Sequence, residues 1–204
     1  MNEVFIIDLQ VGNISSLFQA IQRTGNKPIK ICNPTELSRG KKQFIILPGV
    51  GSTSHYMMQM KYRKFDIFLK DYLKYSNVKL LGICVGMQIL FEESEEHRST
   101  QCLKYFQGKV KKIVIKEKKI QKIPHVGWNS IKSKKETIFS EFDKSYFYFT
   151  HSFAVRAESH HEIAVSSHGK NFTSICNKNN IYGIQFHPEK SGENGQALLK
   201  KFLS

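Results

Sequence analysis

The sequence contains only four cysteines, and they lie far apart, at Cys32, Cys84, Cys102 and Cys176. No two of them have the Cys-x-x-Cys spacing of a redox motif or the ligand spacing of a zinc site. We therefore expect reduced thiols, neither a disulfide framework nor a metal site, and no bound cofactor. A lone cysteine is most often an inert core residue, so chemistry assigned to any of these needs support from its neighbours in the sequence.

Long apolar runs are also absent. No stretch approaches the roughly 18 apolar residues that a membrane-spanning helix requires. The N-terminal segment MNEVFIIDL includes the acidic Glu3 and only a short apolar run, which indicates a first buried strand rather than a signal peptide. We expect a cytoplasmic protein without membrane association. Residues 1–204 are long enough for a single domain with a substantial core.

Acidic residues are scarce, since 17 Asp and Glu stand against 31 Lys and Arg, for a formal net charge of +14. In the densest basic run, Lys109 to Lys122, isoleucines and valines separate the lysines, which predicts exposed strands of a hairpin. No nucleic-acid-binding motif or stacking aromatic accompanies this charge, so a surface facing an anionic substrate or a docking partner is the simpler interpretation. Nucleic-acid binding is the alternative, and it predicts steeply salt-dependent retention on DNA or RNA.

The first half of the chain alternates short apolar strands with helical patterns. Strands are predicted at Val4–Leu9, Pro28–Cys32, Phe44–Leu47 and in the run that begins at Lys79. Helices are predicted at Ser15–Gln22, from Pro34 to Leu37, and at Tyr62–Tyr75. This order predicts right-handed βαβ crossovers, and therefore an α/β fold with an open, mostly parallel sheet covered by helices on both faces.

Beyond Glu96 the pattern changes to short alternating strands. They are predicted at Lys109–Ile115, Ser130–Ser133, Tyr146–Thr150, Glu162–Ser166, Phe172–Asn177 and Ile181–Phe186, before a last helix at Gly195–Leu203. Most of these strands form an antiparallel β extension of the sheet. No internal repeat or linker divides the chain.

The stretch Lys79 to Glu93, KLLGICVGMQILFEE, is predicted to form a strand, a tight turn and a helix. Its Gly82-x-Cys84-x-Gly86 frame is the thiol version of the nucleophile elbow, in which glycines relieve crowding around a strained turn. Cys84 then lies at a helix N-terminus, where the helix dipole and free N–H groups favour the reactive thiolate. The alternative is a buried cysteine in an ordinary strand-to-helix connection.

Reactive groups of open α/β sheets gather at the carboxyl ends of the strands. His187 follows a predicted strand and is placed to act as a base for Cys84, and Glu189, two residues on in an extended segment, is placed to orient it. An oxyanion also needs donors, and the N–H of Val85 and the glycine-rich segment Gly49 to Ser52 can supply them. Together these segments predict a cysteine acyltransferase or amidase.

These residues carry a family resemblance. PGVG at 48–51, GICVGMQ at 82–88 and GIQFHPEKSG at 183–192 resemble the class I, triad-type glutamine amidotransferases. PHVGWN at 124–129 and FYFTHSF at 147–153 are similar to a narrower family, the glutaminase subunits of imidazole glycerol phosphate synthase from histidine biosynthesis. The matches occur in the expected order along the chain.

The resemblance implies a hydrolysis of L-glutamine to glutamate and ammonia. Cys84 attacks the side-chain amide and forms a glutamyl thioester, while His187, held by Glu189, protonates the departing ammonia and then activates water. The oxyanion hole is formed at Val50, Gly51 and Val85. The amino-acid end of the substrate is held by Gly51, Gln88, Ser152 and Phe153.

The resemblance also implies a partner. In that family ammonia passes to a (β/α)8-barrel synthase subunit, which makes imidazole glycerol phosphate and a carboxamide ribotide. The docking face is implied at Asn13, Trp128, Asn129, Tyr148 and Lys190. A core position is the alternative for Trp128, because tryptophan is commonly well buried.

Two departures from the family pattern leave other functions open. The chain has Leu9-Gln10-Val11 where the family has Tyr-Gly before its Gly-Asn, and Ser52-Thr53-Ser54 intervene before the next aromatic residue. Both departures are expected near the partner-facing side. The alternatives are a paralogue that supplies ammonia to a related synthase in surface-sugar biosynthesis, and a non-catalytic regulatory binding module.

Overall fold

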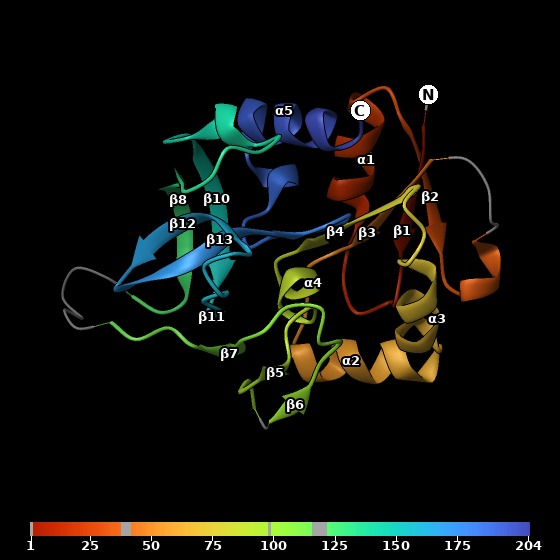
Figure 1. Ribbon diagram of the computed structural model, residues 1–204, viewed down its shortest axis with the longest axis horizontal. Coiled ribbons are helices and arrows are strands. Elements are labelled where there is room, and N and C mark those ends of the chain that lie inside the picture. Colours follow the sequence, from red (N-terminus) through yellow and green to blue (C-terminus); the bar gives the residue numbers. More distant parts are fainter. Residues whose placement is uncertain (1, 38–41, 98, 116–121) are drawn as a thin grey trace.

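The computed structural model describes residues 2–37, 42–97, 99–115 and 122–204. Its centre is an eight-stranded sheet in the order β2-β1-β3-β4-β14-β13-β12-β9 (Figure 1). The first five of these strands are parallel to one another. They are β2 (Lys27–Ile31), β1 (Glu3–Ile7), β3 (Gln43–Leu47), β4 (Val78–Ile83) and β14 (Ile181–Ile184). β1, β3 and β4 are almost wholly buried, which is why most of their residues are apolar.

Helices cover both faces of this sheet. Helices α1 (Ser15–Arg23) and α5 (Gly192–Phe202) lie on one face, and α2 (Thr53–Tyr62) and α3 (Phe65–Tyr72) lie on the other (Figure 1). A 3-10 turn at Pro34–Glu36 stands where a short helix is predicted from Pro34. The arrangement confirms the predicted α/β class, because parallel strands joined by crossovers need cover on both sides.

The antiparallel extension forms the other side of the sheet. It consists of β13 (Lys170–Lys178), β12 (Glu162–His168) and β9 (Lys132–Ser133). Two smaller sheets adjoin it, one made by β10 (Tyr146–His151) and β8 (His125–Ser130), the other by β11 (Phe153–Ala154), β7 (Lys109–Lys112), β5 (Glu93–Ser94) and β6 (Thr100–Gln101). A 3-10 turn at Ser140–Phe142 precedes β10.

The helices between β3 and β4 differ from the prediction. No helix was predicted before Tyr62, but α2 occupies Thr53–Tyr62, and its N-terminus is capped by the Ser52 hydroxyl, which accepts from the His55 N–H at 3.4 Å. The helix predicted at Tyr62–Tyr75 is shorter, because Lys64 adopts φ +61°, a left-handed conformation that separates α2 from α3.

The basic run also folds differently from the prediction. β7 pairs in parallel with β5 and antiparallel with β11, rather than with a neighbouring strand of the same run. Long-range pairing therefore overrode the local hairpin signal. The remaining prediction there, on residues 116–121, lies outside the described residues. Only the last residue of β8, Ser130, lies within a predicted strand; the rest of β8 was not predicted.

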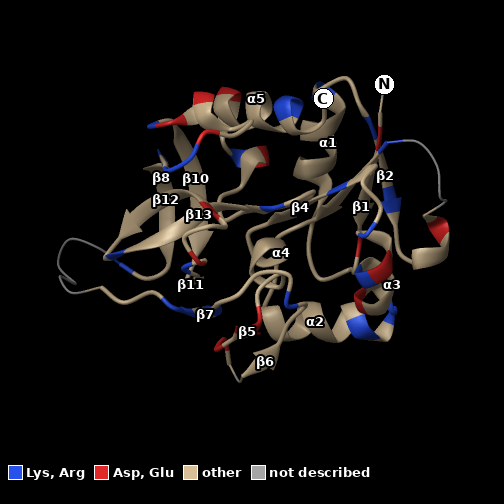
Figure 2. Cartoon of the chain, viewed as in Figure 1, with Lys and Arg blue, Asp and Glu red and all other residues tan. Residues whose placement is uncertain are grey.

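Basic side chains are spread over the molecule. Figure 2 shows Lys and Arg on β2, α3, β7 and α5, which belong to different layers. Within the described ranges, no helix is both long and apolar enough to cross a membrane, and no group of three or more His, Cys, Asp or Glu side chains could hold a metal ion. The cysteines are free thiols.

Candidate active site

The nucleophile elbow lies between β4 and the single-turn helix α4 (Val85–Gln88). Cys84 has φ +50° and ψ −107°, a strained conformation for a residue with a side chain. The turn needs glycine on both sides of Cys84. A Cβ on Gly82 would lie 2.4 Å from the Gly86 carbonyl oxygen, and a Cβ on Gly86 would lie 2.1 Å from the Leu47 carbonyl oxygen.

The helix after Cys84 is shorter than predicted. It contains only four residues, because the chain turns after Gln88. The macrodipole of one turn is small, so the free N–H groups of this first turn, that of Val85 among them, are the donors that can act on the sulfur or on an oxyanion. Cys84 itself is buried, and its N–H donates to the Ile184 carbonyl of β14 at 2.8 Å.

His187 follows β14, whose Ile184 pairs with Ile83 of β4, so the imidazole is delivered to the same sheet edge as Cys84. Its Nδ1 lies 2.8 Å from Glu189 Oε1. The predicted extended segment is wrong in one respect, because residues Pro188–Lys190 form a 3-10 turn. The turn folds the Glu189 carboxylate back onto the imidazole.

The electrostatics of this pair favour an imidazolium ion. Burial lowers the pKa of His187, but the neighbouring Cys84 sulfur and the Glu189 carboxylate raise it, and the net pKa is about 10. The second ring nitrogen, Nε2, is buried without a conventional hydrogen-bond partner among the described residues. It is therefore free to exchange a proton with the sulfur or with a leaving group.

The glycine-rich segment after β3 also reaches this site. Gly51 has φ +90°, a conformation that favours glycine, and it lines the same cavity as Cys84 and Val85. Val50 does not line the cavity. Its side chain packs against Gly12 of the β1–α1 loop, where an added Cβ would lie 2.3 Å from Val50 Cγ2. Only its backbone can serve an oxyanion.

A cavity of about 220 Å³ opens beside Cys84. It is lined by the predicted substrate residues Gly51, Gln88, Ser152 and Phe153, together with Val85, Glu96, Pro124, Thr150 and His151. Gln88 Nε2 donates to the Phe153 carbonyl at 2.9 Å, which holds this wall in place. The cavity is large enough for a small amino acid derivative and joins every substrate residue that the sequence predicted.

Sequence reasoning missed Glu96. It carries the one carboxylate among the described residues that line the cavity. Glu96 Oε2 accepts from the Thr53 N–H at 2.7 Å and from the Thr53 hydroxyl. The departure at Ser52-Thr53-Ser54, which was expected near the partner-facing side, supports the cavity wall through Thr53. A signal was present, because an acidic cluster at 92–96 is unusual in so basic a chain.

Gln185 was also missed as a site residue. It is fully buried, and its Nε2 donates to Cys84 Sγ at 3.5 Å, while its Oε1 accepts from Gln88 Nε2 at 3.1 Å. This contact holds the position of the sulfur from the side of β14. The polar residue in the otherwise apolar run before His187 was the signal for this contact.

Three of the predicted docking residues, Trp128, half-buried Tyr148 and Lys190, form one surface group around an aromatic pair. Trp128 is 53% exposed, which excludes a core position. It pairs with Tyr148 across β8 and β10, with ring centroids 6.1 Å apart, and Lys190 Nζ lies 6.0 Å from the Tyr148 centroid. Asn129 instead turns inward, since its Nδ2 donates to the Ser167 carbonyl at 3.0 Å. The fifth residue, Asn13, lies apart on the β1–α1 loop and accepts from the Ser15 N–H.

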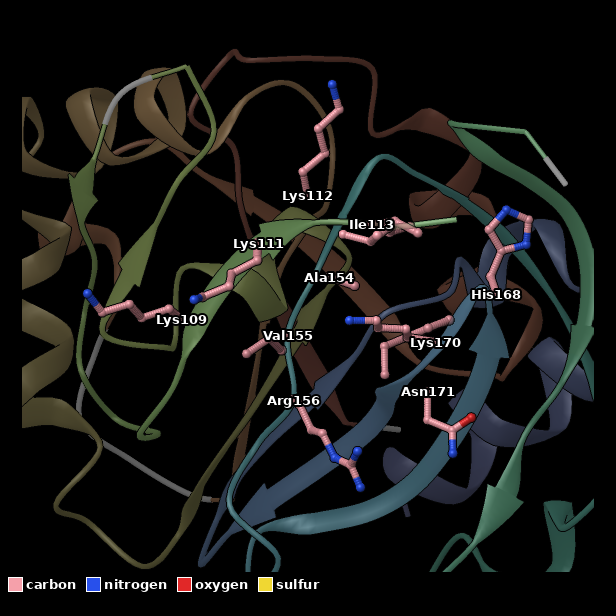
Figure 3. Close-up of a pocket in the computed structure, with 12 residues that line it drawn as sticks. Lys109, Lys111, Lys112, Ile113, Ala154, Val155, Arg156, His168, Lys170 and Asn171 are labelled. Carbon is pink, nitrogen blue, oxygen red and sulfur yellow. The ribbon is translucent and has the colours of Figure 1, made fainter. Parts of the chain in front are cut away.

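A second cavity, of about 400 Å³, shares no residue with the first. Basic side chains surround its apolar floor (Figure 3): Lys109, Lys111, Lys112, Arg156 and Lys170. Lys109 and Lys111 are paired with Glu93 and Glu95, and Lys112 and Arg156 point in opposite directions (Figure 3). The cations do not converge on one point, so this cavity is not an anion site of the kind that a reaction centre needs.

The sequence matches known proteins over nearly its whole length. The family model described as glutamine amidotransferase class-I matches residues 5–204. The chain is 41% identical over 201 residues to "Imidazole glycerol phosphate synthase subunit HisH" of Methanocaldococcus jannaschii, covering 97% of both chains. It is 35% identical to the HisH subunit of Bacillus subtilis, covering 97% of this chain and 93% of that one.

Solved structures agree on the fold. A chain of "Structure of PurLQS from Thermotoga maritima" matches with a TM-score of 0.74 at 17% identity, covering 99% of this chain and 97% of that one. "Crystal structure of glutamine amidotransferase" matches with a TM-score of 0.70 at 15% identity, covering 98% and 97%. These likenesses concern the fold alone, whereas the sequence matches identify the family. The chain belongs to the class I glutamine amidotransferases, among the HisH subunits of imidazole glycerol phosphate synthase.

Proposed function

We propose that this chain is the glutaminase subunit of an imidazole glycerol phosphate synthase in histidine biosynthesis, with Cys84, His187 and Glu189 as its catalytic triad. It acts as one domain, residues 1–204, in the cytoplasm. The observation that carries the proposal is the strained elbow at Cys84 beside the buried His187–Glu189 pair. A thiol held in this way, next to an imidazole of raised pKa, is an activated nucleophile.

The reaction proceeds in two balanced steps. The Cys84 thiolate adds to the carbonyl carbon of the glutamine side-chain amide, and the N–H of Val85 and the backbone at Val50–Gly51 stabilise the oxyanion. The tetrahedral intermediate collapses, the C–N bond breaks, and His187 gives its proton to the departing ammonia. Water then attacks the thioester, His187 takes a proton from it, and glutamate leaves as the C–S bond breaks.

Glutamine is held by the cavity wall opposite the sulfur. The Glu96 carboxylate is the group suited to its α-ammonium, because a cation in a small cavity needs an anionic partner. Gln88 and the backbone of Ser152–Phe153 bind the remaining polar atoms of its amino-acid end. Two Thr53 donors to Glu96 fix the direction of that carboxylate.

The HisH relatives are named as subunits of a synthase, and this chain likewise has a partner subunit. In our proposal the partner is a (β/α)8-barrel synthase that receives the ammonia. Trp128, Tyr148 and Lys190 form the centre of the docking face, with Asn13 and Asn129 at its edges. Trp and Tyr side chains at a surface are typical anchors of stable interfaces.

The test is Cys84→Ala in the complex with the synthase subunit. We expect glutamine-dependent synthesis to be lost and ammonia-dependent synthesis to remain, because only the supply of ammonia needs the thiol. Loss of both activities would assign the cysteine another role. In the wild-type chain a glutamine-analogue electrophile should label Cys84; an unlabelled thiol would favour a non-catalytic regulatory module.

A further inference from the structure

Two buried histidines outside the triad are joined to each other. His125 Nδ1 lies 2.9 Å from His151 Nε2, and the two residues are only 4% and 6% exposed. The remaining ring nitrogens are also engaged. Asn129 Nδ2 lies 3.2 Å from His125 Nε2, and His151 Nδ1 lies 2.8 Å from the Phe153 carbonyl oxygen. Buried polar groups connected in this way have a defined direction of donation.

The direction of donation follows from the two ends of this hydrogen-bond network. A carbonyl oxygen only accepts, so His151 carries its proton on Nδ1 and accepts at Nε2. His125 must then donate from Nδ1 and accept at Nε2, where the Asn129 amide donates. Burial, with the neighbouring histidines, lowers the pKa of His125 to about 3 and that of His151 to about 4, which keeps both rings neutral.

The chain of donors continues to the reactive sulfur. The Phe153 carbonyl also accepts from Gln88 Nε2 at 2.9 Å, and the same nitrogen lies 3.1 Å from Gln185 Oε1. Gln185 Nε2 then donates to Cys84 Sγ at 3.5 Å. The two lone pairs of one carbonyl thus connect the histidine pair to the glutamines that hold the sulfur.

The other end of the network lies on the proposed docking face. Asn129 is adjacent to Trp128 on β8, the strand that exposes the aromatic group. The ring of His125 stacks between those of Phe149 of β10 and His168 of β12, with centroids at 5.0 Å and 4.1 Å, so these strands hold the plane of the ring. A shift of β8 relative to β10 and β12 would change the geometry of the hydrogen bond from His125 to His151.

We propose that His125 and His151 are positioning residues for glutamine hydrolysis, which transmit docking on β8 to the Phe153 wall of the cavity and, through Gln88 and Gln185, to the Cys84 sulfur. This inference rests on the proposed function and deepens it. Neither histidine touches the reacting atoms. Their effect is on where the cavity wall and the sulfur donor lie when the partner is bound.

The test compares three variants in the complex with the synthase subunit, with imidazole glycerol phosphate as the ligand of that subunit. His125→Phe retains the stacking and breaks the hydrogen-bond chain. His125→Asn restores a donor near the position of Nδ1. Phe172→Leu is the packing control, because it alters a ring in contact with both histidines but leaves their hydrogen bonds in place.

The quantity measured is the stimulation factor, defined as glutaminase kcat/KM in the liganded complex divided by that of the free chain. We expect His125→Phe to lower this factor about ten-fold, the size of a typical coupling between sites, with unchanged binding of the synthase subunit. His125→Asn should recover part of the loss, and Phe172→Leu should retain the factor. Wild-type stimulation in a folded His125→Phe, or an equal loss in Phe172→Leu, would overturn the inference.

Two further measurements keep the inference separate from the function. If wild type itself hydrolyses no glutamine in the complex, the proposed function is wrong. If wild type is active and His125→Phe has the same stimulation factor as wild type, the proposed function stands and the histidine network is wrong. Nitrogen-15 spectra of the imidazoles in the wild-type complex should show both rings neutral with the proton on Nδ1. A proton on Nε2 of His151 would reverse the direction of donation and would also overturn the inference.

Discussion

Cys84 combines a reactive side chain with a positive φ of 50°. The strained backbone sets the direction in which the sulfur points, and Gln185, Val85 and His187 supply the polar groups around it. All three residues are buried, so the chemistry depends on a few buried contacts rather than on the net charge of +14. Strain of this kind persists only where surrounding packing over-determines it.

The raised pKa of His187 predicts how stability depends on pH. Its ordinary value of 6.5 applies to the unfolded chain, and its folded value is about 10. The folded state therefore holds the proton more tightly, so this contribution to stability is fully present below about pH 6.5 and is lost as the pH rises toward 10. Urea unfolding between pH 6.5 and 10 should show the loss in the wild type.

Glu189→Gln provides the comparison. It removes one of the charges that raise the pKa of His187, so the loss of stability should begin at lower pH than in wild type. Identical pH dependences of the two proteins would show that the carboxylate does not stabilise the imidazolium ion. The same shift should appear in the alkaline limb of glutaminase activity.

At the scale of elements, the site is made by strand ends. β3, β4 and β14 are neighbours in the sheet and run in parallel, so the segments that follow them meet at one edge. The carboxyl end of β3 provides Gly51, that of β4 provides Cys84, and that of β14 provides His187. Crossovers through helices on both faces are what make this arrangement possible.

Gly82→Ala tests the packing of the elbow. The new methyl would lie 2.4 Å from the Gly86 carbonyl oxygen, which is backbone and cannot move aside without distorting the turn. We expect a loss of about 3 kcal/mol in the free energy of unfolding, at the upper end of overpacking effects. Glutaminase activity should fall with it, because the sulfur moves.

Gly25→Ala is the matched control. Gly25 also has a positive φ, of 82°, but an added Cβ there meets nothing within 4 Å. Only the backbone cost of about 1 kcal/mol remains. Equal effects of the two substitutions in chemical denaturation would contradict the role given to close packing at Gly82.

Thr53→Val tests the link between α2 and the cavity. Valine has the shape of threonine but no hydroxyl, so Glu96 loses one donor and gains freedom to turn. We expect the KM for glutamine to rise about ten-fold, the effect of losing roughly 1.4 kcal/mol of binding, with a smaller change in kcat. Ser54→Ala, on the same helix turn, should leave the KM for glutamine unchanged. An unchanged KM in both variants would show that Glu96 does not bind the substrate.

At the scale of the whole molecule, the Trp128–Tyr148 pair is a separate feature from the reaction site. It lies on the small two-stranded sheet of β8 and β10, whereas lysines are spread over several layers of the molecule (Figure 2). Binding at such a face depends on aromatic anchors, while diffuse basic charge chiefly affects the rate of encounter.

Trp128→Ala should weaken binding of the synthase subunit by about 2 kcal/mol or more, roughly 30-fold in Kd. Titration calorimetry at a fixed salt concentration measures this change. The thermal stability of the variant should change little, because the side chain is largely exposed. Tyr62→Ala removes a tyrosine that is 81% exposed on α2 and serves as the control. Equal weakening by both variants would show that Trp128 is not a specific anchor.

Local patterns predicted most of the fold. The parallel strands follow from continuous apolar runs, and α1 and α5 were placed to within a few residues. The failures have physical causes. α2 carries methionines and polar residues without a clear apolar face, and β7 pairs with strands far away in the chain. Tertiary contacts override local propensity in such segments.

The sequence by itself determined the elbow and the triad candidates, because glycine spacing around Cys84 and the positions of His187 and Glu189 act over a few residues of chain. Only the tertiary structure decided which distant polar atoms meet. Glu96 reaches the cavity through Thr53, and the His125–His151 pair joins β8 to the Phe153 carbonyl. Such contacts depend on strand order and register, which no local pattern of side chains specifies.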